Sequence, residues 1–289
     1  MAFSYDAIKN RDFAPVEQNY TEKDTILYAL GLGFGSEPTN PDHLQYVYEN
    51  GLRALPFMAV VLGYPGFWMR EPSTGIDWVK VLHGEQRLRL HRPLPTSGRV
   101  IGYSKIKSIV DKGASKGAIV VTERVLRNAD NGENLATIEQ VSFLRGNGGF
   151  STPEQPGDTL EPYPNAIADR APDHVMEIAT RPEMALIYRL CADDNALHAD
   201  PAVARAAGFD RPILHGLASY GVAGRAILAA WCDNDPTRLH ALNVRFTAPV
   251  YPGETLRVES WNENGVIGFR VYVTERNIMV LNNGYAEIS

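Results

Sequence analysis

The chain has 289 residues, of which 44% are hydrophobic and 21% are charged, and its formal net charge at pH 7 is -6. These proportions are typical of a soluble globular protein with one large domain or two ordinary ones. The acidic balance argues against a dedicated nucleic-acid binder, and no run of about 20 apolar residues predicts a membrane-spanning helix. Cys191 and Cys232 are too few for a disulfide scaffold, so we expect a cytoplasmic protein.

The first elements predicted along the chain are a helix and three strands. The run "TEKDTILYALGLG" places Thr21 and Asp24 in capping-box positions and ends at glycine, as a helix should. Residues 100–110, 117–127 and 134–144 are rich in Val, Ile, Tyr and Phe and are bounded by Gly, Asn and Asp. This composition predicts antiparallel strands joined by short turns.

The second half repeats this order after a linker. Residues 145–166 are rich in Gly, Pro and Ser, which predicts a connection between two halves. A longer apolar helix is predicted from Gly216 to Cys232, followed by strands at 255–261, 266–275 and 278–288. Both halves place a proline turn before their strands, in "HRPLPTSGRV" and "TAPVYPGETL", and share the string "VTER". We therefore expect an α+β protein with two related repeats, at 1–150 and 166–289, joined by residues 151–165.

Acidic, amide and imidazole side chains gather in the stretch "LCADDNALHADP", between apolar neighbours. Asp193 and His198 are five residues apart, so they point to different sides of a helix or strand and can meet only across a loop. Asp200, Pro201 and Gly208 predict a short capped helix directly after that loop. Buried ionisable groups are costly unless they are paired or do chemistry, so this pair is a candidate acid/base site.

A free backbone amide is predicted close to this pair. If the long helix begins near Gly216, its first N–H groups have no acceptor inside the helix. A glycine leaves such an N–H open to a ligand oxygen, and the helix dipole favours negative charge there. A carboxylate, an imidazole and this amide would together suit a reaction next to a carbonyl group, with the amide as an oxyanion hole.

Other interpretations of these residues stay open. The Asp193–His198 pair could be a structural hydrogen bond only, and Cys191 fits a core residue better than a nucleophile. A metal site made of Asp193, Asn195 and His198 is disfavoured because a stable site needs more carboxylate or imidazole ligands. No G-x-S-x-G motif predicts a serine hydrolase, and "GLGFG" follows a helical run instead of a strand, which disfavours dinucleotide binding.

The stretch "YRLCADDNALHADPAVARAAGFDRPILHGL" closely resembles the signature of the (R)-specific enoyl-CoA hydratases, the hydratase-2 or MaoC-like family. "YALGLG", "LQYVYENG", "VLHGEQRLRLHRPLP", "GNGGF" and "NVRFTAPVYPGETL" also resemble segments of the hydratase-2 domain of peroxisomal multifunctional enzymes of type 2, in the same order. The resemblance implies a double hot-dog fold, with a curled antiparallel sheet around a helix in each repeat and the complete helix only in the second. It also implies reversible addition of water to a trans-2-enoyl-CoA, which gives a (3R)-3-hydroxyacyl-CoA.

The resemblance further assigns roles to particular residues. Asp193 and His198 would hold and activate the water, and Asn195 would orient it. The Gly216 N–H would bind the thioester oxygen, and Glu49 matches a glutamate implicated in the family's reaction. The expected acyl-CoA contacts are His83, Gly84, Lys112 and Phe246. From the residues alone, His83 and Phe246 could equally belong to the core, and Lys112 to a solvated hairpin turn.

The resemblance also bears on partners and on departures from the family pattern. No cofactor or metal is expected. A homodimer is expected, with a (3R)-hydroxyacyl-CoA dehydrogenase as a metabolic neighbour. Ala192 and Ala196 replace the family's usual glycine and proline beside the dyad, but neither change removes a reacting group. The first repeat is expected to accommodate the acyl chain. The alternatives are a dehydratase of acyl-carrier-protein or specialised CoA thioesters such as a steroid side chain, a thioesterase, and an inactive acyl-CoA-binding subunit.

Overall fold

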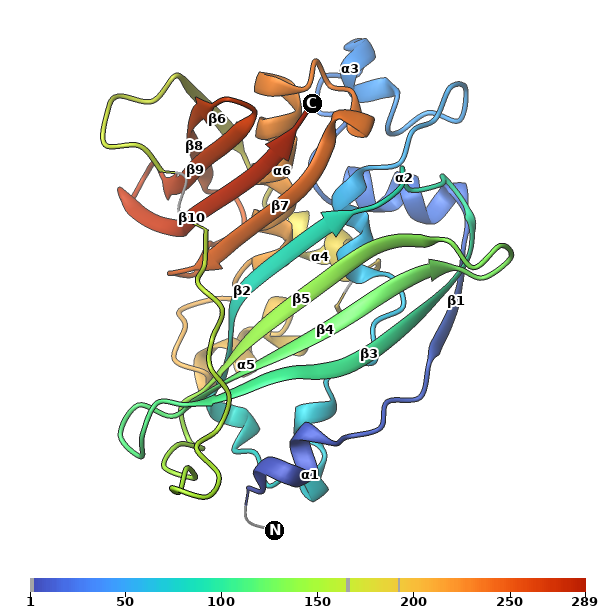
Figure 1. The fold of residues 1–289 in the computed structure, drawn as a ribbon. Coiled ribbons are helices and arrows are strands. Elements are labelled where there is room, and N and C mark those ends of the chain that lie inside the picture. Colours follow the sequence, from blue (N-terminus) through green and yellow to red (C-terminus); the bar gives the residue numbers. More distant parts are fainter. Residues whose placement is uncertain (1–2, 165–166, 192) are drawn as a thin grey trace.

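The computed structural model describes residues 3–164, 167–191 and 193–289, and their strands form one antiparallel sheet (Figure 1). The strands of the first half are β1 (Val16–Tyr20), β2 (Val81–Leu90), β3 (Gly98–Asp111), β4 (Ala118–Asn128) and β5 (Asn134–Leu144). Those of the second half are β6 (His174–Ala179), β7 (Leu239–Phe246), β8 (Thr255–Glu263), β9 (Val266–Val273) and β10 (Ile278–Ile288). All six predicted strands are therefore confirmed, with ends within a few residues of the expected ones.

The two halves of the sheet have the same topology. Their strand orders are β1-β3-β4-β5-β2 and β6-β8-β9-β10-β7, so each strand of the first half has a counterpart five positions later. The halves join where β2 pairs with β7, with Glu85 opposite Arg245 and Arg89 opposite Ala241. Because this pair is antiparallel, one half is related to the other by a rotation of about half a turn. The internal duplication predicted from the strand pattern is present in the fold.

The long helix α6 (Gly216–Trp231) is the centre of the larger hydrophobic core. It packs against β6, β7, β8 and β10 of the second half. Two of its glycines permit an equally close approach from the first half: a Cβ on Gly221 would lie 2.6 Å from Leu32, and one on Gly224 would lie 2.6 Å from Phe57. The remaining α-helices are α1 (Tyr5–Lys9), α2 (Glu22–Leu30), α3 (Pro41–Leu44), α4 (Met184–Tyr188) and α5 (Pro201–Ala206).

The first half has no helix equivalent to α6 among its described residues. Its predicted helix is α2, where the Thr21 N–H donates to the Asp24 carboxylate at 2.8 Å, as the capping-box pattern indicated. However, α2 follows β1 as α4 follows β6, so its counterpart is α4 and not α6. The inner face of the first half is covered instead by a buried 3₁₀ segment, Pro56–Val61.

The linker lies along the outer face of the sheet (Figure 1). The Asp158 carboxylate accepts the Ile109 N–H at 2.7 Å, and Lys107 pairs with Glu161 at 2.8 Å. The Tyr163 ring lies under two arginines, one on β2 and one on β7, and so spans the join between the halves. Residues 165 and 166, at the end of the predicted linker, lie outside the described residues.

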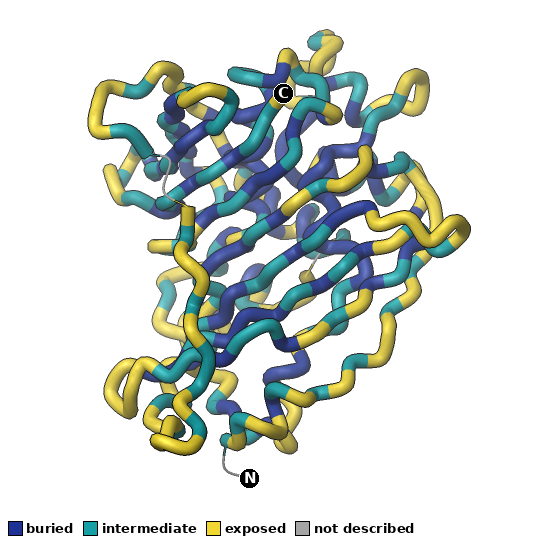
Figure 2. The backbone as a smooth tube through the Cα atoms, viewed as in Figure 1, coloured by how far each residue is buried: buried dark blue, intermediate teal, exposed yellow. Residues whose placement is uncertain are grey.

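Burial follows the layering of the sheet (Figure 2). Strand residues alternate between buried and accessible positions, as β4 does with Val120 and Leu126 buried on its inner face. A second, smaller core cluster forms at the far end of the first half around Ile8, Trp68 and Val120. In the described part of the chain, none of the helices combines the length and apolar character needed to cross a bilayer.

Candidate active site

A loop with its own internal hydrogen bonds presents Asp193, Asn195 and His198. The Asn195 N–H donates to Asp193 Oδ1 at 2.9 Å, and the Leu197 N–H donates to Asn195 Oδ1 at 3.1 Å. Short polar side chains commonly form such local bonds in turns. A single 3₁₀ turn, Ala196–His198, follows, and Asp200 then caps α5 by accepting the Ala202 N–H at 2.7 Å. The loop between a helix end and a capped helix is therefore as predicted.

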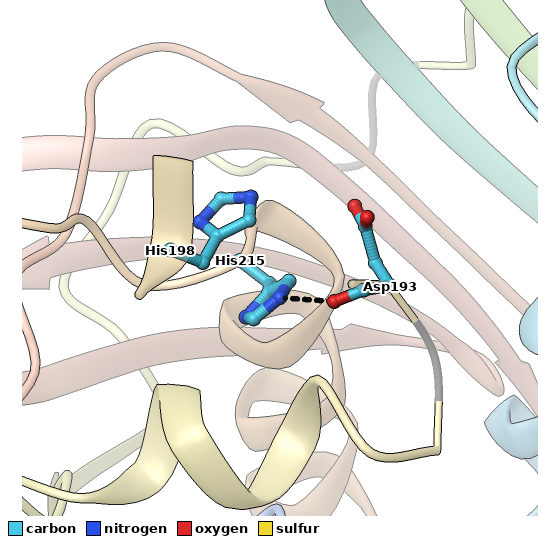
Figure 3. A group of neighbouring side chains, drawn as sticks. All are labelled: Asp193, His198 and His215. Atoms are coloured by element: carbon cyan, nitrogen blue, oxygen red, sulfur yellow. Dashed lines mark hydrogen bonds between the residues drawn. The ribbon is translucent and has the colours of Figure 1, made fainter. Parts of the chain in front are cut away.

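This loop brings the acid and the imidazole together. One potential ligand atom from each of Asp193, His198 and His215 lies within 4.8 Å of the others. Figure 3 shows the Asp193 carboxylate opposite the His198 ring, with the His215 ring below both in this view. His198 Nδ1 lies 2.9 Å from the Ile213 carbonyl oxygen, which can only accept, so Nδ1 carries the proton. Nε2 of His198 is consequently left with the free lone pair that a general base needs.

His215 was not identified from the sequence. It is the residue before α6, its Nε2 donates to the Asp193 carbonyl oxygen at 3.0 Å, and its ring stacks on His198 with centroids 3.7 Å apart. His215 therefore fixes the backbone of the acid and the ring of the base at the same time. Its only signal in the sequence was a histidine inside the apolar run "PILHGL", directly before the predicted helix start.

The surroundings keep both imidazoles neutral near pH 7. Burial lowers the pKa of His198, and this shift is opposed by its bond to the Ile213 carbonyl and by the Asp193 charge. Burial and then the neighbouring His198 lower the pKa of His215 to about 3. Neutral imidazole is the form that can accept a proton, so the protonation state of His198 is compatible with a general base.

These lowered pKa values predict that the fold weakens in acid. Burial also lowers the pKa of His83 to about 4. Below pH 6.5 the unfolded chain binds protons at His83, His198 and His215 that the folded chain does not, so the free energy of unfolding falls as the pH falls; above that pH these groups contribute no slope. Each such proton adds a slope of about 1.4 kcal/mol per pH unit. Urea unfolding between pH 7 and 5 measures this slope.

A substitution at His215 isolates the contribution of that ring to the pH dependence of stability. His215→Asn should reduce the slope of the unfolding free energy with pH by up to the contribution of one proton, because it removes one group that stays neutral in the folded chain. The wild-type protein, unfolded in parallel over the same pH range, is the reference. An unchanged slope in the His215 variant would show that His215 is not held neutral by burial.

The predicted free amide is at the start of α6. Gly216 is the first residue of the helix, and the Ala218 and Ser219 N–H groups donate to the His215 carbonyl oxygen. Among the described residues, the Gly216 N–H has no acceptor. A Cβ on Gly216 would lie 3.2 Å from the Phe246 ring, so this ring forms one wall beside the amide. The first turn of α6 thus offers an unpaired donor next to the histidines.

Two of the predicted substrate contacts adjoin this wall. The His83 and Phe246 rings meet edge-on with centroids 4.8 Å apart, and the buried His83 Nε2 has no hydrogen-bond partner among the described residues. The Asp193 charge acts on His83 and opposes the lowering of its pKa by burial. Gly84 follows at a bulge in β2, where a Cβ would lie 3.3 Å from the Val141 carbonyl oxygen. His83, Gly84 and Phe246 therefore lie around the candidate site.

Lys112 and Glu49 lie apart from this cluster. Lys112 is exposed in the turn between β3 and β4, at the same end of the sheet as the start of β2. Glu49 is exposed, and nearby Tyr46 donates to the Asn234 carbonyl oxygen beyond the C-terminal end of α6. The 16 residues of α6 span about 24 Å, so Glu49 lies at the opposite end of this helix from Gly216. The structure does not bring Glu49 to the dyad.

The two positions that depart from the family pattern are placed differently. Ala192 lies outside the described residues. Ala196 begins the 3₁₀ turn that carries His198, and the Asn195 side chain caps that turn. An alanine is compatible with this turn because the turn has a side-chain cap of its own.

Asp193, His198 and His215 also form a group of potential metal ligands. The metal site weighed from the sequence contained Asp193, Asn195 and His198, and so lacked the second imidazole of His215. A metal binds an imidazole nitrogen at about 2.1 Å along its lone pair, in the plane of the ring. The His198 and His215 rings stack at an interplanar angle of 28°, so their lone pairs do not converge on one point. This geometry suits proton transfer better than chelation by both rings.

Comparison with known proteins places this site in a family. Residues 164–283 match the model of the MaoC like domain, and residues 18–146 match that of the MFE-2 hydratase 2 N-terminal domain. A probable enoyl-CoA hydratase 2 of Dictyostelium discoideum is 38% identical over 289 residues, covering 96% of this chain and 94% of that protein. Peroxisomal multifunctional enzyme type 2 of Mus musculus is also 38% identical and matches 93% of this chain, which spans only 36% of that longer protein.

Solved structures confirm the expected fold. A MaoC-like dehydratase from Phytophthora capsici superposes with a TM-score of 0.85 at 34% identity, covering 99% of both chains. A Mycobacterium tuberculosis protein described as having a double hotdog fold, 15% identical, has a TM-score of 0.55 over 96% of this chain and 95% of that one. The resemblance noted in the sequence is thus confirmed over nearly the whole length. The chain belongs to the MaoC-like, hydratase-2 family, with an α+β double hot-dog fold.

Proposed function

We propose that this protein catalyses the reversible hydration of a trans-2-enoyl-CoA to a (3R)-3-hydroxyacyl-CoA. The observation that carries the proposal is the grouping of the Asp193 carboxylate, the His198 base and the start of α6 with its unpaired Gly216 amide. The names of the relatives in the same family support the reaction. The (R) stereochemistry is what the resemblance to the hydratase-2 signature implies. A role in fatty acid β-oxidation follows from this substrate class.

In the proposed reaction, water is held between Asp193 and His198. His198 Nε2 removes a proton from the water as its oxygen bonds to C3 of the enoyl group. The electron pair of the C2–C3 double bond moves towards the thioester, and the Gly216 N–H stabilises the charge that develops on the thioester oxygen. A proton is then delivered to C2, so that one water is added in total and the histidine returns to its neutral form.

The other predicted residues have supporting parts in this proposal. Asn195 Oδ1 is already occupied by the Leu197 N–H, which leaves the Asn195 amide group to orient the water. His83, Gly84 and Phe246 would line the path of the acyl thioester. Lys112, exposed at the same end of the sheet, would meet the phosphates of CoA as a mobile positive charge. The reaction calls for no cofactor beyond the CoA thioester itself.

We also propose a homodimer, a cytoplasmic location and a (3R)-hydroxyacyl-CoA dehydrogenase that consumes the product. The dehydrogenase follows from the chemistry, because the secondary alcohol at C3, β to the thioester carbonyl, can be oxidised to a 3-oxo group. Dehydration on an acyl carrier protein, or of a specialised CoA thioester such as a steroid side chain, uses the same groups in the reverse direction. An inactive acyl-CoA-binding subunit would lack a reason to hold His198 as a free base.

One assay distinguishes these functions. The protein is incubated with crotonyl-CoA and with a long-chain trans-2-enoyl-CoA, and the absorbance of the conjugated thioester is followed. We expect the absorbance to fall without release of free thiol, and the product to be the (3R) alcohol. Release of thiol would identify a thioesterase, a (3S) product would contradict the stereochemistry, and no reaction with either thioester would leave only a binding role.

A further inference from the structure

Polar side chains form a band across the inner face of the first half of the sheet, between its two hydrophobic core clusters. On β4, Leu126 belongs to the larger cluster and Val120 to the smaller one, while Thr122 and Arg124 lie between them on the same face. Neighbouring strands continue this band: Gln140 lies opposite Thr122, and Ser104 opposite Arg124. An inner face that serves only as a core would carry apolar residues at these positions.

Arg124 is the charged member of this band. It is only 5% exposed, and its Nη2 donates to the Val60 carbonyl oxygen at 2.6 Å. Its Nε has no partner among the described residues, and none of the described carboxylates forms an ion pair with it. A buried guanidinium with no counter-charge is costly, and such groups are normally paired with an acid or serve a ligand.

A cavity lies in front of this arginine. Arg124 lines it together with Tyr64, Trp68, Thr122 and Gln140. The Arg124 guanidinium lies 5.5 Å from the centroid of the Tyr64 ring. Pro65 and Ile138 complete the wall, so only part of its surface is polar. The polar part offers hydrogen-bond donors and acceptors that an entirely aliphatic chain could not use.

The cavity and the dyad lie within electrostatic range of each other. Burial raises the pKa of Tyr64; the Arg124 charge opposes that shift, and the Asp193 charge adds to it. Tyr64 therefore lies near both the buried cation and the catalytic acid. In register along the sheet, Gln86 of β2 lies opposite Gln140, so the polar band reaches the strand that carries His83.

We propose that Arg124 binds a carboxylate at the far end of the acyl group, so that this protein prefers enoyl-CoA thioesters whose acyl chain ends in a carboxylate over those that end in a methyl group. The inference rests on the proposed hydratase function and specifies its substrate class. A carboxylate would supply the missing counter-charge and accept from the free guanidinium donors. Thr122 and Gln140 would complete its hydrogen bonds, while the thioester end reaches the Gly216 amide.

The test compares pairs of trans-2-enoyl-CoA thioesters of equal chain length that end in a carboxylate or in a methyl group. We expect kcat/KM to favour the carboxylate by about ten- to one-hundredfold at the length that reaches Arg124, and at no shorter length, as a hydrogen bond to a charged group would provide. Arg124→Met should remove this preference, and Arg124→Lys should keep part of it. Arg127→Met is the matched control, because Arg127 lies on the same strand but is exposed on the outer face, over Tyr103.

The outcomes separate this inference from the function on which it rests. If crotonyl-CoA is hydrated but the wild-type protein never prefers the carboxylate at any length, Arg124 does not bind the substrate and the inference is wrong. A preference that survives in Arg124→Met would also overturn it. If no enoyl-CoA is hydrated at all, the proposed function itself fails. The comparison in the wild-type protein needs no variant, so an Arg124 variant that fails to fold would still leave the inference testable.

Discussion

Asp193→Asn and His198→Gln should each lower kcat for enoyl-CoA hydration by about a thousandfold or more, near the upper end of what general acid–base catalysis contributes. Asparagine cannot carry the negative charge of Asp193, and glutamine cannot act as the base that His198 Nε2 provides. Both substitutions are close in shape. The amide oxygen introduced by Asp193→Asn can still accept the Asn195 N–H, which lies 2.9 Å from Asp193 Oδ1 in the native loop.

The control for this prediction is Asp194→Asn. Asp194 is the exposed neighbour of Asp193, and its carbonyl oxygen, which the substitution leaves in place, accepts from Arg189. Turnover by this variant should remain near that of the wild type, and all three variants should unfold at similar temperatures. Near-full turnover by either dyad variant would show that the loop does not supply the reacting groups.

Gly216→Pro should lower kcat by about 10²- to 10³-fold relative to Gly216→Ala, the cost of one oxyanion-hole donor. Proline removes the N–H and places a ring carbon on the nitrogen, and the first position of a helix is where proline is best tolerated. His215 has φ -56° and ψ 135°, an extended conformation that a residue before proline readily adopts. Both variants place a Cβ against Phe246, so their difference reports replacement of the amide hydrogen by the ring and not the added Cβ. Steady-state rates with crotonyl-CoA measure it.

Equal rates for the alanine and proline variants would contradict this role of the amide. The thioester oxygen would then have to be stabilised elsewhere. If the two equal rates are also below that of the wild type, the loss is due to crowding by the added Cβ, which lies 3.2 Å from the Phe246 ring.

The sequence predicted those parts of the fold that depend on local pattern. The strands with long β-branched runs, the capping box at Thr21 and the cap at Asp200 all follow from neighbouring residues. Four strands were not identified. The short strands β1 and β6 at the two edges of the sheet carry polar residues that do not alternate clearly, and β2 and β7, which join the two halves, were missed as well. The sequence suggested that α2 is the counterpart of α6. Only the topology shows that its counterpart is α4, because each of these two short helices follows the first strand of its half.

The candidate site was predictable only in part for a similar reason. The loop pattern identified Asp193 and His198, and the predicted start of the long helix identified Gly216. His215 stacks on His198 and contacts the carbonyl oxygen of Asp193, 22 residues away in the sequence. These contacts depend on the tertiary fold and cannot be predicted from the spacing of residues. Glu49 matched a motif, but the structure places it at the far end of α6.

The repeated string "VTER" illustrates the same limit at the level of single residues. In the first half its arginine, Arg124, is buried on β4 without a counter-ion among the described residues. In the second half the corresponding Arg276 lies after the end of β9 and pairs with Glu254 at 2.6 Å. Identical letters thus stand in different environments, because β9 ends at the first residue of the string, Val273, whereas β4 continues past it to Asn128. Only the packing of the first half reveals an unpaired cation.

A crystal structure of the protein with bound (3R)-3-hydroxybutyryl-CoA would test the central claim most directly. We predict that the 3-hydroxyl oxygen lies within hydrogen-bond distance of both the Asp193 carboxylate and His198 Nε2, and that the thioester oxygen accepts from the Gly216 N–H. A thioester bound with its oxygen away from the start of α6, or a hydroxyl group that contacts neither Asp193 nor His198, would contradict the mechanism.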